Sequence, residues 1–180
     1  MLQEAQIPIV YHDEMRDTKG KLRVLSLFSG CGGMDLGFEG MFIANRKSFP
    51  QDSLYIDHAI NKNWVMLKKT KFKTVFANDI LNEAEVAWTT YMSRFGYQPE
   101  MYHNISIVDL VKMHKQGADI FPKDIEVVTG GFPCQDFSVA GKRKGFNSDK
   151  DDYGKKREGD EPSEETRGKL YYWMKQVIAT

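Results

Sequence analysis

Apolar and polar positions along the chain form blocks that favour strands and helices in turn. The most continuous apolar block is 22–28, LRVLSLF, which has the pattern of a strand buried on both faces. Further strands are predicted at 74–77 and 125–129, each followed by residues typical of turns. Strands that alternate with helices favour an α/β fold with a mostly parallel sheet and right-handed crossovers.

Helical patterns lie between and after these strands. A short helix is predicted over 34–39, and a longer one over 82–95. One face of the longer helix collects its large and small apolar side chains: Ala84, Ala87, Trp88 and Tyr91. Another short helix is predicted over 105–115, after a candidate strand, and a last one over 170–178.

Three segments depart from this alternation. Residues 1–20 are polar with weak periodicity, and we expect an N-terminal extension to a domain that covers 21–180. Residues 41–71 have mixed polarity, and we interpret them as an insertion into that domain. Residues 142–166 are hydrophilic and lack an apolar period, which favours a mobile loop.

Composition limits the class of protein. The chain has 180 residues, 41% of them hydrophobic, which suits one domain with a sizeable core. Its 25 basic and 25 acidic side chains balance, but residues 142–157 hold seven basic and three acidic ones, and 158–165 hold five acidic ones alone. No apolar run approaches the roughly 18 residues of a membrane span, and the first residues lack the order of a signal peptide. We therefore expect a cytoplasmic protein without a membrane partner.

Cysteines and histidines argue against a metal site. The two cysteines, Cys31 and Cys134, give no disulfide framework, and the four histidines show no ligand spacing. We therefore expect no metal.

Three loops follow predicted strands and, in a parallel sheet, should share the edge where ligands bind: 29–33, 78–80 and 130–138. The first, SGCGG, is a turn whose backbone can approach a ligand closely, although it fits neither the dinucleotide nor the P-loop pattern. Asp79 is the type of carboxylate that accepts ribose hydroxyls, and its structural alternative is the N-cap of the helix that begins near Asn82. Together these loops indicate a nucleoside cofactor.

Cys134 lies in the third loop, within GGFPCQDFS. A lone cysteine is more often an apolar filler than a nucleophile. Here Pro133 fixes the backbone, Gly130 and Gly131 allow an unusual path, and the cations at 142–144 favour the thiolate. A filler has no need of such a platform, so we interpret Cys134 as a candidate nucleophile.

Five motifs occur along the chain in a fixed order: FSGCGG at 28–33, ND at 78–79, GFPCQDFS at 131–138, GKRKGF at 141–146 and RGKL at 167–170. In these motifs and their order the chain resembles the cytosine-5 DNA methyltransferases, from about residue 22 to residue 180. The resemblance implies a Rossmann-like methyltransferase fold, S-adenosylmethionine as cofactor and double-stranded DNA as substrate. It also implies a role in a restriction–modification system of a prokaryote or phage.

The resemblance assigns roles to individual residues. The cofactor would be held by Phe28, Ser29, Gly30, Cys31, Gly32, Gly33, Asp79, Ile80, Asn104, Ile105, Pro133 and Leu170. Asp79 would accept the ribose hydroxyls and Ile80 would pack on adenine, while Asn104 stands where the family usually has Asp. DNA would be contacted by Gln135, Ser138, Lys142, Arg143, Lys144 and Arg167.

The resemblance makes Cys134 the nucleophile that attacks C6 of a cytosine flipped out of the duplex. The attack makes C5 electron-rich enough to take the methyl group, and loss of the C5 proton with the thiolate then restores the ring.

The family carries further segments that this sequence lacks: Glu-Asn-Val, the target-recognition region and a final motif beside the cofactor. The resemblance therefore implies a fragment, or half of a split enzyme completed by a second chain, with little methyltransferase activity alone. Two alternatives stay open, a tRNA cytosine-5 methyltransferase and a non-catalytic module that binds S-adenosylmethionine or nucleic acid. An NAD-linked or thiol enzyme is a third.

Overall fold

A four-stranded parallel sheet forms the centre of the protein. The computed structural model describes residues 20–132, 155 and 169–180. The sheet has the order β6-β5-β1-β7. Its strands are β1 (Leu22–Leu27), β5 (Phe72–Asp79), β6 (Tyr102–Asn104) and β7 (Val127–Gly130). The predicted strands at 22–28, 74–77 and 125–129 correspond to β1, β5 and β7, and the α/β fold class is confirmed.

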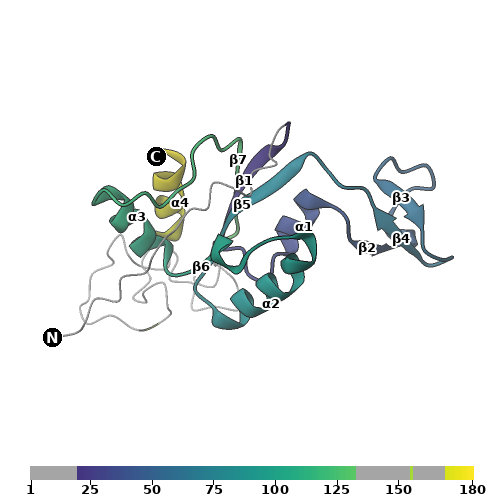
Figure 1. Cartoon of the computed structure of the whole chain (residues 1–180), viewed down its shortest axis with the longest axis horizontal. Helices are drawn as coiled ribbons and strands as arrows, with labels where there is room; N and C mark the ends of the chain where they lie inside the picture. Colours follow the sequence, from purple (N-terminus) through teal and green to yellow (C-terminus); the bar gives the residue numbers. More distant parts are fainter. Residues whose placement is uncertain (1–19, 133–154, 156–168) are drawn as a thin grey trace.

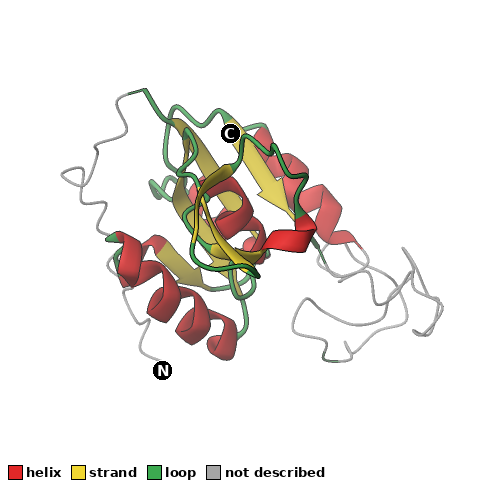
Figure 2. Ribbon diagram, turned by 90° about the vertical axis from the view of Figure 1, so that its right-hand side faces the viewer, coloured by secondary structure: helices red, strands yellow, loops and turns green. Residues whose placement is uncertain are grey.

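Helices cover both faces of this sheet (Figures 1 and 2). One face carries α1 (Gly33–Glu39) and α2 (Asn82–Met92), and the other carries α3 (Ile107–Lys115) and α4 (Leu170–Ile178). Successive residues of a strand point to opposite faces, so Phe76 packs in the core beneath α3 and α4 while Ala77 packs against α2.

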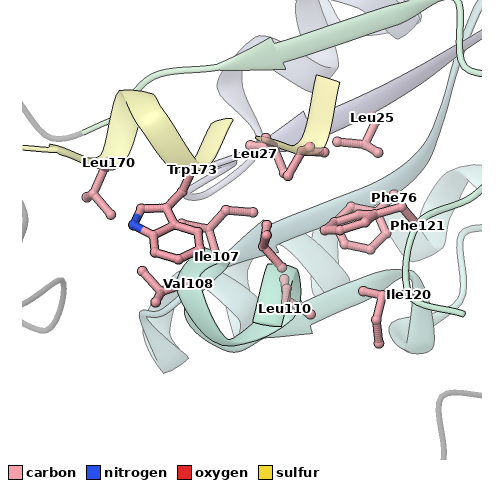
Figure 3. Packing of buried hydrophobic residues seen from close by; sticks show 12 residues of the cluster. Leu25, Leu27, Phe76, Ile107, Val108, Leu110, Ile120, Phe121, Leu170 and Trp173 are labelled. Atoms are coloured by element: carbon pink, nitrogen blue, oxygen red, sulfur yellow. The ribbon is translucent and has the colours of Figure 1, made fainter. Parts of the chain in front are cut away.

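The larger core lies between the sheet, α3 and α4 (Figure 3). Leu25 and Leu27 of β1 meet Leu110 of α3 and Trp173 of α4, and none of these four side chains is more than 6% exposed. The α4 helix therefore belongs to the same hydrophobic unit as the first strand, although it is distant in sequence.

The order of the strands creates a switch in winding direction between β1 and β7. From β1 the chain builds outward through α1 to β5 and through α2 to β6. It then returns through α3 and adds β7 on the other side of β1. The loops that leave β1 and β7 therefore diverge, and ligands of such sheets bind in the crevice between them.

Residues 41–71 form a second, antiparallel sheet of three short strands, at the end of the molecule beyond α1 (Figure 1). Its order is β2-β4-β3, with β2 (Ile43–Asn45), β3 (Ile56–Ala59) and β4 (Trp64–Leu67). The sequence analysis assigned no strands here, because the strands have only three or four residues each and Val65 and Leu67 of β4 are their only buried side chains.

The remaining elements differ from prediction mainly at their ends. The predicted helix over 82–95 stops being α-helical at Met92 and continues as the 3-10 turn η3 (Ser93–Phe95). Ala87 is exposed, since the buried side of α2 follows the spacing Ala84, Trp88, Met92. Two other 3-10 turns are η2 (Arg46–Ser48) and η4 (Pro99–Met101). Within the described ranges, no helix has the length and apolar character needed to cross a bilayer.

Candidate cofactor site

Two of the three predicted loops meet at the carboxyl edge of the sheet. The N–H of Ser29 donates to the carbonyl of Asn78 at 2.8 Å, and the N–H of Gly30 donates to Oδ2 of Asp79 at 3.0 Å. The third loop begins beside them, where the ring of Phe132 meets that of Phe28 edge-on with centroids 6.4 Å apart. The prediction of a shared edge is confirmed for 29–33 and 78–80.

The loop after β1 has an unusual backbone. Phe28, Gly30 and Gly32 have φ angles of 53°, 53° and 85°, all in the left-handed region. Such a conformation strains a bulky residue, so Phe28 keeps it only because its surroundings impose it. Its ring packs on the core beneath α3 and α4. Strain of this kind is common where a backbone is shaped for a ligand.

Asp79 ties this loop to the end of β5. Its Oδ1 accepts from the N–H groups of Ile80 at 2.8 Å and Leu81 at 3.1 Å, while Oδ2 accepts from Gly30. The N-cap of α2 is Leu81 and has no side-chain hydrogen bond, so the N-cap alternative for Asp79 was wrong. A carboxylate has about four lone-pair positions, so these three donors leave room for a hydroxyl donor.

Asparagine side chains connect β5 to the loop after β6. The buried amide of Asn78 donates to the carbonyls of His103 at 2.9 Å and Ile105 at 2.6 Å. Asn104 donates through Nδ2 to the carbonyl of Asp79 at 3.4 Å, which leaves its Oδ1 as an acceptor. Asn104 therefore offers an uncharged acceptor, whereas the sequence analysis expects the resembled family to have an Asp here.

Tyr102 and His103 of β6 support the same edge. The hydroxyl of Tyr102 donates to the carbonyl of Gly30 at 3.1 Å, and burial raises the pKa of Tyr102, so it stays a donor. His103 stacks on Phe76 with ring centroids 4.3 Å apart, and burial lowers the pKa of His103 to about 4. Both rings are therefore uncharged at neutral pH.

The edge has the features that a nucleoside cofactor requires. A side chain added at Gly30, Gly33 or Gly131 would meet no atom of the described residues, so the described part of the chain leaves the backbone there uncovered. Beside it lie a carboxylate that can accept a hydroxyl, Asp79, and half-buried apolar side chains, including Ile80 and Ile105. Backbone without side chains, an acceptor and apolar walls fit a ribose and a purine ring.

Other predicted site residues take different positions. Cys31 and Gly33 are exposed on the loop. Leu170 is 2% exposed, in the core beneath α3 and α4 to which Phe28, Ile105 and Phe132 are peripheral. The remaining predicted residues lie outside the described residues: Pro133, Cys134, Gln135, Ser138, Lys142, Arg143, Lys144 and Arg167. Among the side chains that are described, no three His, Cys, Asp or Glu residues gather as a metal centre would need.

The model of the C-5 cytosine-specific DNA methylase family matches residues 22–153. The chain belongs to this family. The match begins at β1 and includes all three loops of the carboxyl edge as well as Cys134.

Several relatives are methyltransferases of known type. The chain is 35% identical to Type II methyltransferase M.BsuRI of Bacillus subtilis over 126 residues, 68% of this chain and 25% of that protein. It is 33% identical to M.BspRI of Lysinibacillus sphaericus over 140 residues, 74% of this chain and 28% of that protein. It is 28% identical to M1.ScrFI of Lactococcus lactis subsp. cremoris over 173 residues, which are 96% of this chain and 29% of that protein. The chain thus spans between a quarter and a third of these relatives' length.

The sequence analysis assigned no site role to four residues that shape this edge, although it included Asn78 in the motif ND and placed Trp88 on the apolar face of a helix. They are Asp35, Asn78, Trp88 and Tyr102, all buried beneath or beside the loop after β1. Their contacts join elements far apart in the chain, so no local pattern reveals them. One signal was available, since Asp35 is a charged residue inside a short apolar helix.

Proposed function

We propose that the protein transfers a methyl group from S-adenosylmethionine to C5 of cytosine in double-stranded DNA. The observation that carries this proposal is the family match over 22–153, which joins the cofactor loops of the carboxyl edge to the Pro133–Cys134 turn. Relatives named Type II methyltransferases support a role in restriction–modification, which would take place in the cytoplasm of a prokaryotic cell, with the gene encoded by the cell or by a phage.

S-adenosylmethionine would be held at the loops after β1 and β5. The backbone of Gly30 to Gly33 would face it, with Asp79 accepting from a ribose hydroxyl and Ile80 against the adenine. Asn104 would accept from the adenine amino group through Oδ1, because its Nδ2 is engaged with Asp79. When bound, the cofactor supplies the methyl group that is transferred.

Cys134 would supply the nucleophile. Its thiolate forms a bond to C6 of the flipped cytosine, and C5, now electron-rich, takes the methyl group. The C5 proton is then lost to a base and the C6–S bond breaks, which restores the ring and the thiolate. Pro133 would line both the cofactor and the target base, and Leu170 would close the pocket from α4.

DNA would approach along the carboxyl edge. The cations Lys142, Arg143, Lys144 and Arg167 would meet phosphates, and Gln135 and Ser138 would lie next to the extruded base. A second chain that carries the recognition segments is part of this proposal, because base readout requires contacts in a groove.

A trapping experiment tests the covalent step. The protein, completed by a chain that supplies the recognition segments, is incubated with S-adenosylmethionine and a mixed-sequence duplex in which 5-fluorocytosine replaces cytosine. Fluorine at C5 cannot leave as a proton does, so we expect a protein–DNA adduct that survives denaturation and needs the cofactor. Cys134→Ser should abolish it.

Parallel samples separate the alternatives. An adduct formed only with 5-fluorocytosine tRNA would select the tRNA methyltransferase. Calorimetry in which the protein binds S-adenosylmethionine, yet forms no adduct with either nucleic acid once the recognition segments are supplied, would favour a non-catalytic module. Binding of NAD without any response to S-adenosylmethionine would overturn the proposal.

A further inference from the structure

Asp35 is a buried acid directly below the loop after β1. It lies on α1, two residues after that helix begins, and its relative exposure is 0%. Burial of a carboxylate is unfavourable unless it is hydrogen-bonded, so its presence in this position calls for a role. None of the roles that the family match suggests uses Asp35.

The carboxylate of Asp35 holds an indole. Nε1 of Trp88 on α2 donates to Oδ2 of Asp35 at 2.6 Å, and both side chains are fully buried. Hydrogen bonds to a charged acceptor are shorter and roughly twice as strong as neutral ones. Because Trp88 has no other polar atom, this contact sets how its ring is turned.

The ring of Trp88 forms the floor of the glycine loop. A Cβ at Gly32 would lie 2.7 Å from Cδ1 and 3.1 Å from Nε1 of Trp88, so the loop backbone rests directly on the indole. The Gly32 carbonyl in turn accepts the first hydrogen bond of α1, from Leu36 at 2.9 Å. A change in the tilt of the indole therefore moves the turn at Gly32.

The other oxygen of Asp35, Oδ1, is buried and has no hydrogen-bond partner among the described residues. The hold of Asp35 on the loop therefore runs through Oδ2 and the indole of Trp88.

We propose that Asp35 is a positioning residue for the cofactor loop, acting through Trp88 on Gly32. It touches neither cofactor nor substrate. Its effect is to keep the backbone of residues 29–32 in the shape that binds the cofactor, so the inference rests on the proposed function.

The charge of Asp35 matters for this role, which gives it a pH signature. Burial raises the pKa of Asp35, the hydrogen bond from Trp88 opposes this rise, and the charge of Glu39 adds to it. Tyr97 and Tyr102 also face it, and burial raises the pKa of each, so neither loses its proton near neutral pH. Protonation of Asp35 at low pH weakens its hold on the indole and loosens the loop.

Calorimetry with S-adenosylhomocysteine tests the proposal. We expect Asp35→Asn to weaken binding about tenfold, the loss of one charge-assisted hydrogen bond. The matched control is Glu39→Gln, one turn further along the same helix, where the buried carboxylate bonds Tyr97 and the N–H of Thr74 instead. Glu39→Gln should lower the free energy of unfolding and change the dissociation constant less than about twofold.

A pH profile separates positioning from plain destabilisation. Between pH 7 and pH 4.5 the wild-type affinity should fall more steeply than that of Asp35→Asn, which has no carboxylate to protonate. Trp88→Phe keeps a ring but removes the indole donor. Because Asp35→Asn and Trp88→Phe disrupt the same hydrogen bond, the double variant should bind S-adenosylhomocysteine no more weakly than the weaker-binding single variant. Additive losses, or parallel pH profiles, would overturn the proposal.

A measurement made in the absence of cofactor distinguishes failure of the Asp35 inference from failure of the proposed function. The indole N–H resonance of Trp88 in the wild-type protein should shift with pH as Asp35 takes up its proton, while those of Trp64 and Trp173 should not shift with it. If the wild type binds no S-adenosylhomocysteine but this shift occurs, the proposed function fails and the Asp35–Trp88 coupling stands. If the cofactor binds and the resonance does not move, the positioning role is wrong.

Discussion

At the scale of single residues, polar side chains hold the carboxyl edge in shape by bonding to backbone. Asn78, which is 1% exposed, fixes the chain after β6 through two carbonyls, and Asp79 gathers three N–H groups from two loops. Buried groups of this type must be satisfied, so the loops have few alternative conformations. The edge is therefore ordered before any ligand arrives.

His103 makes stability depend on pH. Burial lowers its pKa from 6.5 to about 4, so between these values the unfolded chain binds a proton that the folded chain does not. The free energy of unfolding should therefore fall as pH decreases through this window, by roughly 2–3 kcal/mol. Urea unfolding at pH 7 and pH 4.5 measures this, and His103→Phe, which keeps a ring against Phe76, should show a smaller loss. Equal losses would contradict the assignment.

At the scale of elements, α1 is the described helix that depends most on tertiary contacts for its stability. It has seven residues, contains Gly37, and lacks a side-chain N-cap, so its own sequence gives it little stability. Asp35 and Glu39 instead bind it to α2, to β5 and to Tyr97, which follows η3. Tertiary contacts hold this helix against the sheet.

Two glycines near α1 should respond oppositely to the same change. Gly37→Ala should stabilise the protein by up to about 1 kcal/mol, because a methyl group there meets open space and favours the helix. Gly32→Ala should cost about 2–3 kcal/mol, because φ is +85° and the methyl group would clash with Trp88. Thermal unfolding of both variants checks this. A Gly32→Ala protein as stable as the wild type would show that the indole can move aside.

The elements that were predicted correctly share one property, a local pattern that tertiary contacts reinforce. The continuous apolar run of β1 and the amphipathic α4 (Leu170–Ile178) appear in the structure almost at the predicted bounds. The strands of residues 41–71 were missed because their pairing, not their pattern, defines them. The contact partners of Asp79 were also missed, because backbone donors from another loop leave no trace in sequence.

At the scale of the whole molecule, the fold depends on segments distant in sequence. Among the described strands β7 lies at the end of the sheet beside β1, and α4 lies over it, where Met174 would meet a side chain at Gly130 at 3.0 Å. Trp173 of the same helix fills the space between α3 and the sheet (Figure 3). The last described helix thus packs in the same hydrophobic core as the first strand.

Two tryptophans test this closure. Trp173 is 6% exposed in the core, and Trp64 is 44% exposed on the small sheet. Trp173→Ala should lower the free energy of unfolding by about 3–5 kcal/mol, and Trp64→Ala by less than about 1 kcal/mol. Urea denaturation followed by far-ultraviolet circular dichroism compares the two. Similar losses would mean that α4 is not integral to the core.

The narrow neck of the small sheet has a consequence for how this fold can be altered. The chain leaves and returns at one place, where Gly40 pairs with Lys69 and the N–H of Thr70 donates to the carbonyl of Glu39 at 3.0 Å. Everything beyond that clamp lies away from the cofactor loops (Figure 1). Evolution or an engineer can therefore exchange the segment between the two sides of the neck, for a short turn or a foreign module, without re-registering β1 and β5.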